Sequence, residues 1–178
     1  FFEDSALATL KNMGLLKGIN PLLTADLLHV LRSMGHGDKL CLCDCNFPAA
    51  TVATKTTSQK NVILSCTLPE AIDAICSVLP LDFFEHTQAS FMAPQESPGA
   101  PVALVKDMPT AGIEVVEALK TTIRKHCPDA TIESWGRFDF YDEATTCFAV
   151  VQTMERRPYG NIILTKGCVG PDGKDLKP

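Results

Sequence analysis

Short apolar segments alternate with amphipathic helical segments along most of this chain, and that alternation constrains the fold more than any other feature. Strands are predicted at about residues 39–43, 61–66, 83–92, 131–135, 148–153 and 161–166. Helices are predicted at about residues 24–34, 67–79, 111–126 and 138–145. Alternating strands and helices are typical of α/β proteins, so we expect a sheet that is covered by helices.

Several helix ends can be placed from single residues. Thr24 can cap the first helix, and Gly35 follows its last turn, where glycine commonly ends a helix. Thr67 and Glu70 form the pattern of a capping box, in which each side chain bonds an amide that the helix leaves unpaired. Pro128 prevents the helix at 111–126 from continuing. These signals support the helical assignments independently of the apolar spacing.

The bulk composition excludes two classes of partner. The 178-residue chain is 46% apolar and 21% charged, with a net charge of −5. An acidic balance disfavours nucleic acids, whose phosphates require clustered lysine and arginine. No apolar run approaches the roughly 20 residues that a membrane helix needs, and the first residues lack the pattern of a secretory signal. We therefore expect a cytoplasmic protein without a nucleic-acid or membrane partner.

One domain is expected, at residues 13–170. Residues 1–12 are interpreted as an N-terminal extension, and residues 171–178 as a frayed C-terminal tail. Residues 94–101 contain three prolines and are predicted to form a loop. Residues 51–60 are polar and rich in threonine, which predicts a surface loop or a weak strand.

Eight cysteines are present, most of them in apolar stretches and none in a C-x-x-C pair. A disulfide framework is typical of short secreted chains, so we expect reduced thiols that pack in the core. Cys41, Cys43 and Cys45 alternate and would share one side of a strand, an arrangement that does not surround a tetrahedral metal. Glycine-rich nucleotide motifs and the H-E-x-x-H zinc motif are also missing from the sequence. We expect neither a metal nor a cofactor.

The first polar cluster is Met34-Gly35-His36-Gly37-Asp38, between a predicted helix and a predicted strand. Histidine is the side chain whose unperturbed pKa lies near neutrality, so this residue type suits proton transfer. Glycines on both sides allow a ligand to approach the backbone closely. The same pattern is also typical of a solvated turn, so both interpretations stay open.

Two more polar clusters follow or precede strands. Asp44 and Asn46 come directly after the strand at 39–43, and they could bind hydroxyl groups of a ligand. Tyr159-Gly160-Asn161, with Glu155 a few residues before it, precedes the last strand. In α/β proteins such ends are where ligand sites lie. Simple turns remain an alternative interpretation for both clusters.

Taken in order, these clusters resemble one family, the fucose mutarotases of the RbsD/FucU group of sugar mutarotases. The resemblance is carried by Leu16-Lys17-Gly18-Ile19, Pro21-Leu22-Leu23-Thr24, Met34 to Asp38 and Asp44 to Pro48 in the first half, and in the second half by Arg137-Phe138-Asp139-Phe140-Tyr141-Asp142-Glu143-Ala144, Phe148 to Val151, Glu155, Tyr159 to Leu164 and Lys166-Gly167. It covers about residues 15–169. Each motif alone is weak, but five in the right order are specific.

The resemblance implies an L-fucose mutarotase, an isomerase built on a single-domain mixed β-sheet flanked by helices. His36 would correspond to the catalytic proton donor or acceptor, and Tyr159 could be the second proton-transfer group. Substrate contacts are implied for Asp44, Arg137, Tyr159, Gly160 and Asn161, with Tyr141 and Glu155 as further contacts. The family also implies a ring-shaped homo-oligomer whose monosaccharide sites lie between subunits.

A sister branch, the ribose pyranases, resembles the chain in the glycine–histidine turn and the Tyr-x-Asn loop. That branch typically has histidine where this chain has Arg137, so Arg137 and Tyr141 favour the fucose branch. The chain departs from the fucose pattern at Lys39, where glutamate is frequent, and in residues 51–61, which lack the expected turn. Pyranose–furanose interconversion, a non-catalytic sugar-binding module and a purely structural oligomer remain as alternatives.

Overall fold

The computed structural model describes residues 14–93 and 110–178. The strands in these ranges are β1 (Lys39–Cys43), β2 (Asn61–Ile63), β3 (Ala89–Ala93), β4 (Ile132–Gly136), β5 (Ala149–Gln152) and β6 (Ile162–Thr165). The helices are α2 (Ala25–Ser33), α3 (Ala49–Ala53), α4 (Leu68–Cys76), α5 (Thr110–His126) and α6 (Arg137–Ala144). The extension predicted at 1–12 and the loop predicted at 94–101 lie outside the described residues.

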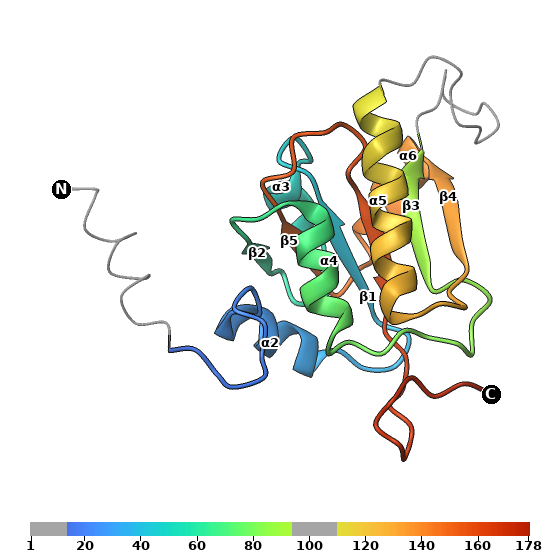
Figure 1. The fold of residues 1–178 in the computed structure, drawn as a ribbon. Coiled ribbons are helices and arrows are strands. Elements are labelled where there is room, and N and C mark those ends of the chain that lie inside the picture. The colour runs from blue at the N-terminus through green and yellow to red at the C-terminus, as the bar shows by residue number, and fades with distance from the viewer. Residues whose placement is uncertain (1–13, 94–109) are drawn as a thin grey trace.

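All six strands form one sheet in the order β2-β5-β1-β6-β3-β4 (Figure 1). β2, β5 and β1 run parallel to one another, as do β3 and β4. β6 lies between β1 and β3 and is antiparallel to both. The sheet is therefore mixed, as expected, and the carboxyl ends of its parallel strands gather at the edge where β6 begins.

Helices cover both faces of the sheet. Apolar side chains of α2, α4 and α5 pack with Leu40 and Leu42 of β1 in the larger core, and Figure 1 shows α4 and α5 side by side across that face. On the opposite face α3 and α6 pack with Cys41 and Cys43 of β1 in a smaller core. β1 is apolar on both faces because both are covered, which is typical of a central strand.

The predicted helix signals are confirmed. The Thr24 hydroxyl accepts a hydrogen bond from the Leu27 amide at 3.3 Å, at the start of α2. Thr67 and Glu70 form the predicted capping box at α4, and the Thr67 amide donates to Glu70 Oε2 at 2.8 Å. α2 ends at Ser33, before the turn that carries His36. This turn is thereby fixed between a capped helix and the central strand.

Three local predictions are wrong. Residues 51–60 were predicted to form a surface loop or a weak strand, but the first three of them belong to α3 (Ala49–Ala53), and only 54–60 form a loop. The helix starts after Pro48, alanine favours helix, and Val52 and Ala53 are buried. The strand expected at 83–92 is confined to β3, since the Gln88 side-chain Nε2 donates to the carbonyls of Asp82 and Glu85 and so folds the preceding residues into a loop. The strand expected at 61–66 ends at Ile63.

The C-terminal tail is also ordered by contacts, not frayed. Val169 and Asp175 form a β-bridge, and the Leu176 amide donates to the Cys168 carbonyl at 2.9 Å. The Cys127 thiol donates to Asp175 Oδ2 at 3.0 Å. Local polar contacts, which composition does not report, thus hold a segment rich in glycine and lysine.

The eight cysteines are all free, and six of them are buried. Burial raises the pKa of the Cys66 thiol to about 11 and of the Cys147 thiol to about 12. Cys41 and Cys43 share one face of β1 as predicted, whereas Cys45 lies beyond the strand and is exposed.

None of the helices within residues 14–93 and 110–178 has the length and apolarity that a membrane crossing requires.

Candidate functional site

The predicted site residues lie at two opposite ends of the sheet. Asp44 follows the last residue of β1, and His36 precedes its first. A strand of five residues spans about 16 Å, so the two side chains are far apart within one chain. Figure 1 shows the same separation, with α2 near one end of the sheet and α3 and α6 near the other. We call these the histidine end and the aspartate end.

At the aspartate end, Asp44 and Asn161 are bonded to each other. The Asn161 side-chain amide donates to Asp44 Oδ2 at 3.1 Å, and the Asp44 backbone amide donates to Asn161 Oδ1 at 3.1 Å. Asp44 Oδ1 accepts from the amides of Asn46 and Phe47, which is the turn geometry that the sequence left open. Burial raises the pKa of the Asp44 carboxyl, against these hydrogen bonds.

Tyr159 and Gly160 complete the aspartate end with an unusual backbone. Tyr159 has a φ of 64°, in the left-handed region that bulky residues rarely adopt. A Cβ atom on Gly160 would lie 2.9 Å from Glu155 Cγ and 3.3 Å from the Arg157 carbonyl oxygen. Only glycine fits there, so this residue allows the loop to close against Glu155. Tyr159 packs against both cores at the rim of the sheet.

Glu155 lies beside this loop, but its carboxylate faces protein groups. Oε1 accepts from the Arg157 backbone amide at 3.0 Å and from Arg157 Nε at 2.8 Å. Oε2 accepts from Arg157 Nη2 at 2.7 Å and from the Leu68 amide at 3.4 Å. The ion pair with Arg157 lowers the pKa of Glu155 against the opposing effect of burial. Glu155 therefore stabilises the loop through hydrogen bonds to Arg157 and Leu68.

Arg137 and Tyr141 are brought to the same end by α6. Arg137 is the first residue of α6 and is exposed, with its guanidinium 4.9 Å from the Phe138 ring centre. β4 comes directly before α6, and its Trp135 is paired with Met92 of β3. The Met92 backbone amide in turn donates to the Asn161 carbonyl at 3.0 Å, which places β3 beside Asn161. Tyr141 stacks on Phe47 with ring centres 5.2 Å apart. Tyr141 is therefore linked through Phe47 to the turn of Asp44, and Arg137 lies at the start of α6 at the same end of the sheet.

The turn that carries His36 is held from the last strand. Gly37 has a φ of 82°, which glycine adopts without strain, and its amide donates to the Lys166 carbonyl at 2.8 Å. The Lys166 ammonium donates to the carbonyls of Leu31 and Met34 at the end of α2, at 2.9 and 2.5 Å. Burial lowers the pKa of Lys166. Lys166 thus donates hydrogen bonds to carbonyls at the C-terminal end of α2 and also holds the turn of His36 through its own carbonyl.

His36 is paired with a buried carboxylate that the sequence interpretation missed. Its Nε2 lies 3.1 Å from Asp82 Oδ2, and the Asp82 side chain is 1% exposed against 48% for His36. Asp82 Oδ1 accepts from the Phe84 amide at 3.0 Å, and the Phe84 ring meets the imidazole edge to face at 5.5 Å. The only sequence signal is an aspartate inside the apolar run Leu79-Pro80-Leu81-Asp82-Phe83.

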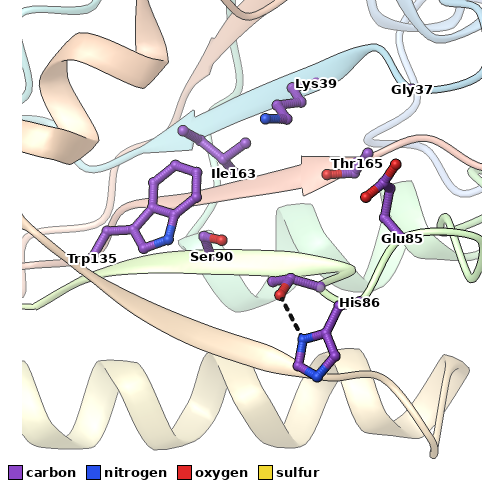
Figure 2. A pocket seen from close by; sticks show the side chains of 9 residues that line it. Gly37, Lys39, Glu85, His86, Ser90, Trp135, Ile163 and Thr165 are labelled. Atoms are coloured by element: carbon purple, nitrogen blue, oxygen red, sulfur yellow. Dashed lines mark hydrogen bonds between the residues drawn. The ribbon is translucent and has the colours of Figure 1, made fainter.

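A cavity of about 450 Å³ opens on the sheet face beside the histidine end. It is lined by Gly37, Lys39, Glu85, His86, Thr87, Ser90, Trp135, Ile163 and Thr165. These residues come from β1, β3, β4 and β6 and from the segments before β1 and β3 (Figure 2). Lys39 pairs with Glu143 of α6 and lies 5.8 Å from the Trp135 ring centre. An aromatic wall with polar groups around it suits a small polyhydroxyl ligand.

Among the described residues, no group of three or more His, Cys, Asp or Glu side chains is arranged to hold a metal ion. The chemistry available comes from an oriented imidazole at one end of the sheet and from hydroxyl-binding groups at the other. An α/β fold with these two ends defines a small-molecule binding protein that is equipped for proton transfer.

This chain belongs to the RbsD/FucU family: residues 17–169 match the RbsD / FucU transport protein family. It is 34% identical over 160 residues to the fucose mutarotase of Danio rerio, covering 90% of this chain and 98% of that protein. It is similar to the crystal structure of the fucose mutarotase from Streptococcus pneumoniae in complex with L-fucose, at 32% identity and a TM-score of 0.70, over 87% of this chain and 100% of that one.

The Bacillus subtilis RbsD structure, complexed with D-ribose, aligns with 88% of this chain and 100% of its own, at a TM-score of 0.59. Its sequence identity is 17%, so this likeness shows the fold alone. The family match and the mixed sheet confirm the predicted family and fold.

Proposed function

We propose that this chain interconverts the α and β anomers of free L-fucose, as an isomerase without a cofactor. One observation carries the proposal: the imidazole of His36 is aligned by the buried carboxylate of Asp82, at a family-typical turn. The relatives support the sugar, since the proteins from D. rerio and S. pneumoniae are both fucose mutarotases. Eight free cysteines support a cytoplasmic location, where thiols stay reduced.

The separation of the two ends supports a site that is shared between subunits. About 16 Å of strand lies between His36 and Asp44, a distance that no monosaccharide bridges. The histidine end of one subunit therefore meets the aspartate end of the next, with the sugar between them. Because the two contacting surfaces are different parts of the same chain, the contact is head-to-tail, and its closed repetition forms a ring.

Mutarotation opens the hemiacetal ring and closes it on the other face of the anomeric carbon. A proton leaves the anomeric hydroxyl while another reaches the ring oxygen, and closure reverses both transfers. His36 exchanges the proton at the anomeric end, and the Tyr159 phenol, or a water molecule, serves the other position. Asp44, Asn161 and Arg137 bind the remaining hydroxyl groups and so fix which atom meets the imidazole.

The role of His36 can be tested by saturation-transfer NMR on L-fucose. His36→Ala removes the proton-transfer group, so anomer exchange falls by roughly 10²–10⁴-fold, the usual contribution of a positioned acid or base. The thermal midpoint is measured alongside, because His36→Ala also takes a partner from the buried Asp82 carboxylate. His29→Ala is the matched control, because His29 is exposed on α2 and away from the turn. Unchanged exchange in His36→Ala would remove this residue from the mechanism.

The same measurement on a panel of free sugars separates the alternatives. Faster exchange on D-ribose than on L-fucose would indicate pyranose–furanose interconversion. Sugar binding without faster exchange would indicate a binding module, and the absence of any sugar binding would indicate a structural oligomer.

A further inference from the structure

We infer that Glu155 and Arg157 are positioning residues, which together hold Tyr159 in the strained backbone conformation that aims its phenol into the site. This inference rests on the proposed function, because it concerns how one candidate catalytic group is presented. Neither residue needs to touch the sugar. We call the pair and the loop that it closes, residues 155–161, the tyrosine clamp.

The first observation is the backbone of Tyr159 itself. Its φ of 64° places an aromatic residue in the left-handed region, where the Cβ atom crowds the backbone. Among the non-glycine residues that the structure describes, only Gln59 shares a positive φ. Such a conformation persists only where the surroundings impose it, and residues of this kind cluster at functional sites.

The second observation is what imposes it. Glu155 is 3% exposed, and its two carboxylate oxygens accept three hydrogen bonds from Arg157, one from the backbone and two from the guanidinium. The planar guanidinium binds both oxygens of the Glu155 carboxylate at once and so fixes the orientation of the two side chains. A lysine ammonium has no such planar pair of donors. The chain between Arg157 and Asn161 must therefore close a short loop, and Tyr159 lies at its tip.

The third observation is that the clamp is anchored to two other segments of the chain and is closely packed within itself. The Cys45 amide, next to Asp44, donates to the Glu155 carbonyl at 2.9 Å. The Leu68 amide at the start of α4 donates to Glu155 Oε2. Gly160 packs on Glu155 so closely that no side chain fits. Glu155 thus sets the position of Tyr159 relative to Asp44 and Asn161, the groups that bind the substrate.

A test can use the fact that the chain has only two tyrosines, Tyr141 and Tyr159. With tyrosine rings labelled with ¹³C, the wild type gives two sets of ring signals, which Tyr141→Phe assigns. Arg157→Lys should shift or broaden the Tyr159 signals and leave those of Tyr141 in place. Because a misplacement of about 1 Å can cost on the order of 10²-fold, anomer exchange at saturating L-fucose should fall about 10- to 100-fold.

The KM for L-fucose should change by less than about threefold in Arg157→Lys, since the groups that bind hydroxyls stay in place. Arg156→Ala is the matched control, because it removes a neighbouring exposed charge and leaves both readouts at the wild-type values. The double variant Glu155→Gln/Arg157→Gln avoids an unpaired buried charge, so it keeps the test usable if the single variant unfolds.

Tyr159 signals and exchange rates that match the wild type in both variants would overturn the inference. A rise in KM with an unchanged rate at saturation would also overturn it, because that would show uniform loss of binding. If the wild type accelerates no anomer exchange at all, the proposed function fails. The Tyr159 signals of Arg157→Lys still report on the clamp in that case, so the two failures are distinguishable.

Discussion

At the scale of single residues, the pair of His36 and Asp82 shows what the sequence reveals and what it conceals. His36 can be recognised because two glycines flank it and a helix and a strand surround it. Asp82 comes 46 positions later and is joined to His36 only by the fold, at 3.1 Å. Its sole signal is a charged residue within an apolar run, which alone does not identify a partner.

The pairing predicts the effect of Asp82→Asn. The asparagine oxygen can still accept from the Phe84 amide, so the loop is kept, but the negative charge that faces the imidazole is lost. An orienting carboxylate fixes the tautomer and stabilises the protonated ring. We expect anomer exchange to fall by about 10-fold or more, with a small change in thermal midpoint.

Asp26→Asn is the control for this prediction, since Asp26 is exposed at the start of α2. Equal exchange rates in Asp82→Asn and the wild type, measured by saturation-transfer NMR, would show that Asp82 does not assist His36.

At the scale of elements, periodicity and capping residues predicted most of the helices and strands. The helix predicted at 111–126 corresponds to α5 at Thr110–His126, and the strand at 39–43 to β1. The failures lie where local contacts outweigh composition, as in α3, where Pro48 and two alanines start a helix inside a Thr-rich segment. The ion pair between Glu155 and Arg157, which stabilises the loop, could not be predicted either, because nothing in the sequence shows which carboxylate is buried.

The buried ion pair predicts how stability depends on pH. Arg157 lowers the pKa of Glu155 in the folded chain, so the pair stabilises the fold above the unfolded pKa of about 4.3. Its contribution is lost as the pH falls through the lowered folded pKa.

Glu155→Gln should therefore lower the free energy of unfolding by about 2–4 kcal/mol near pH 7. The difference from the wild type should shrink below about pH 4, where the wild-type carboxylate is protonated as well. Urea unfolding at several pH values measures this. A difference that stays constant from pH 7 to pH 3 would show that the charge of Glu155 does not stabilise the fold.

At the scale of the whole molecule, the sheet presents two unlike ends, and the proposed reaction needs both. The polar clusters that the sequence identified lie at the ends of the sheet, but their separation along β1 could not be read from their order. Only the fold shows that His36 lies apart from Asp44 and Asn161 in one chain. The proposed shared site and head-to-tail contact rest on this separation and on the small size of a monosaccharide.

Coexpression of His36→Ala with Asn161→Ala tests the shared site most directly. Each variant alone lacks one half of every site and should exchange L-fucose anomers slowly. In mixed rings, a subunit with intact His36 can meet a subunit with intact Asn161, so random assembly restores about one quarter of the sites. Saturation-transfer NMR should then show about a quarter of the wild-type exchange rate, whereas no recovery beyond the single variants would contradict a site built from two subunits.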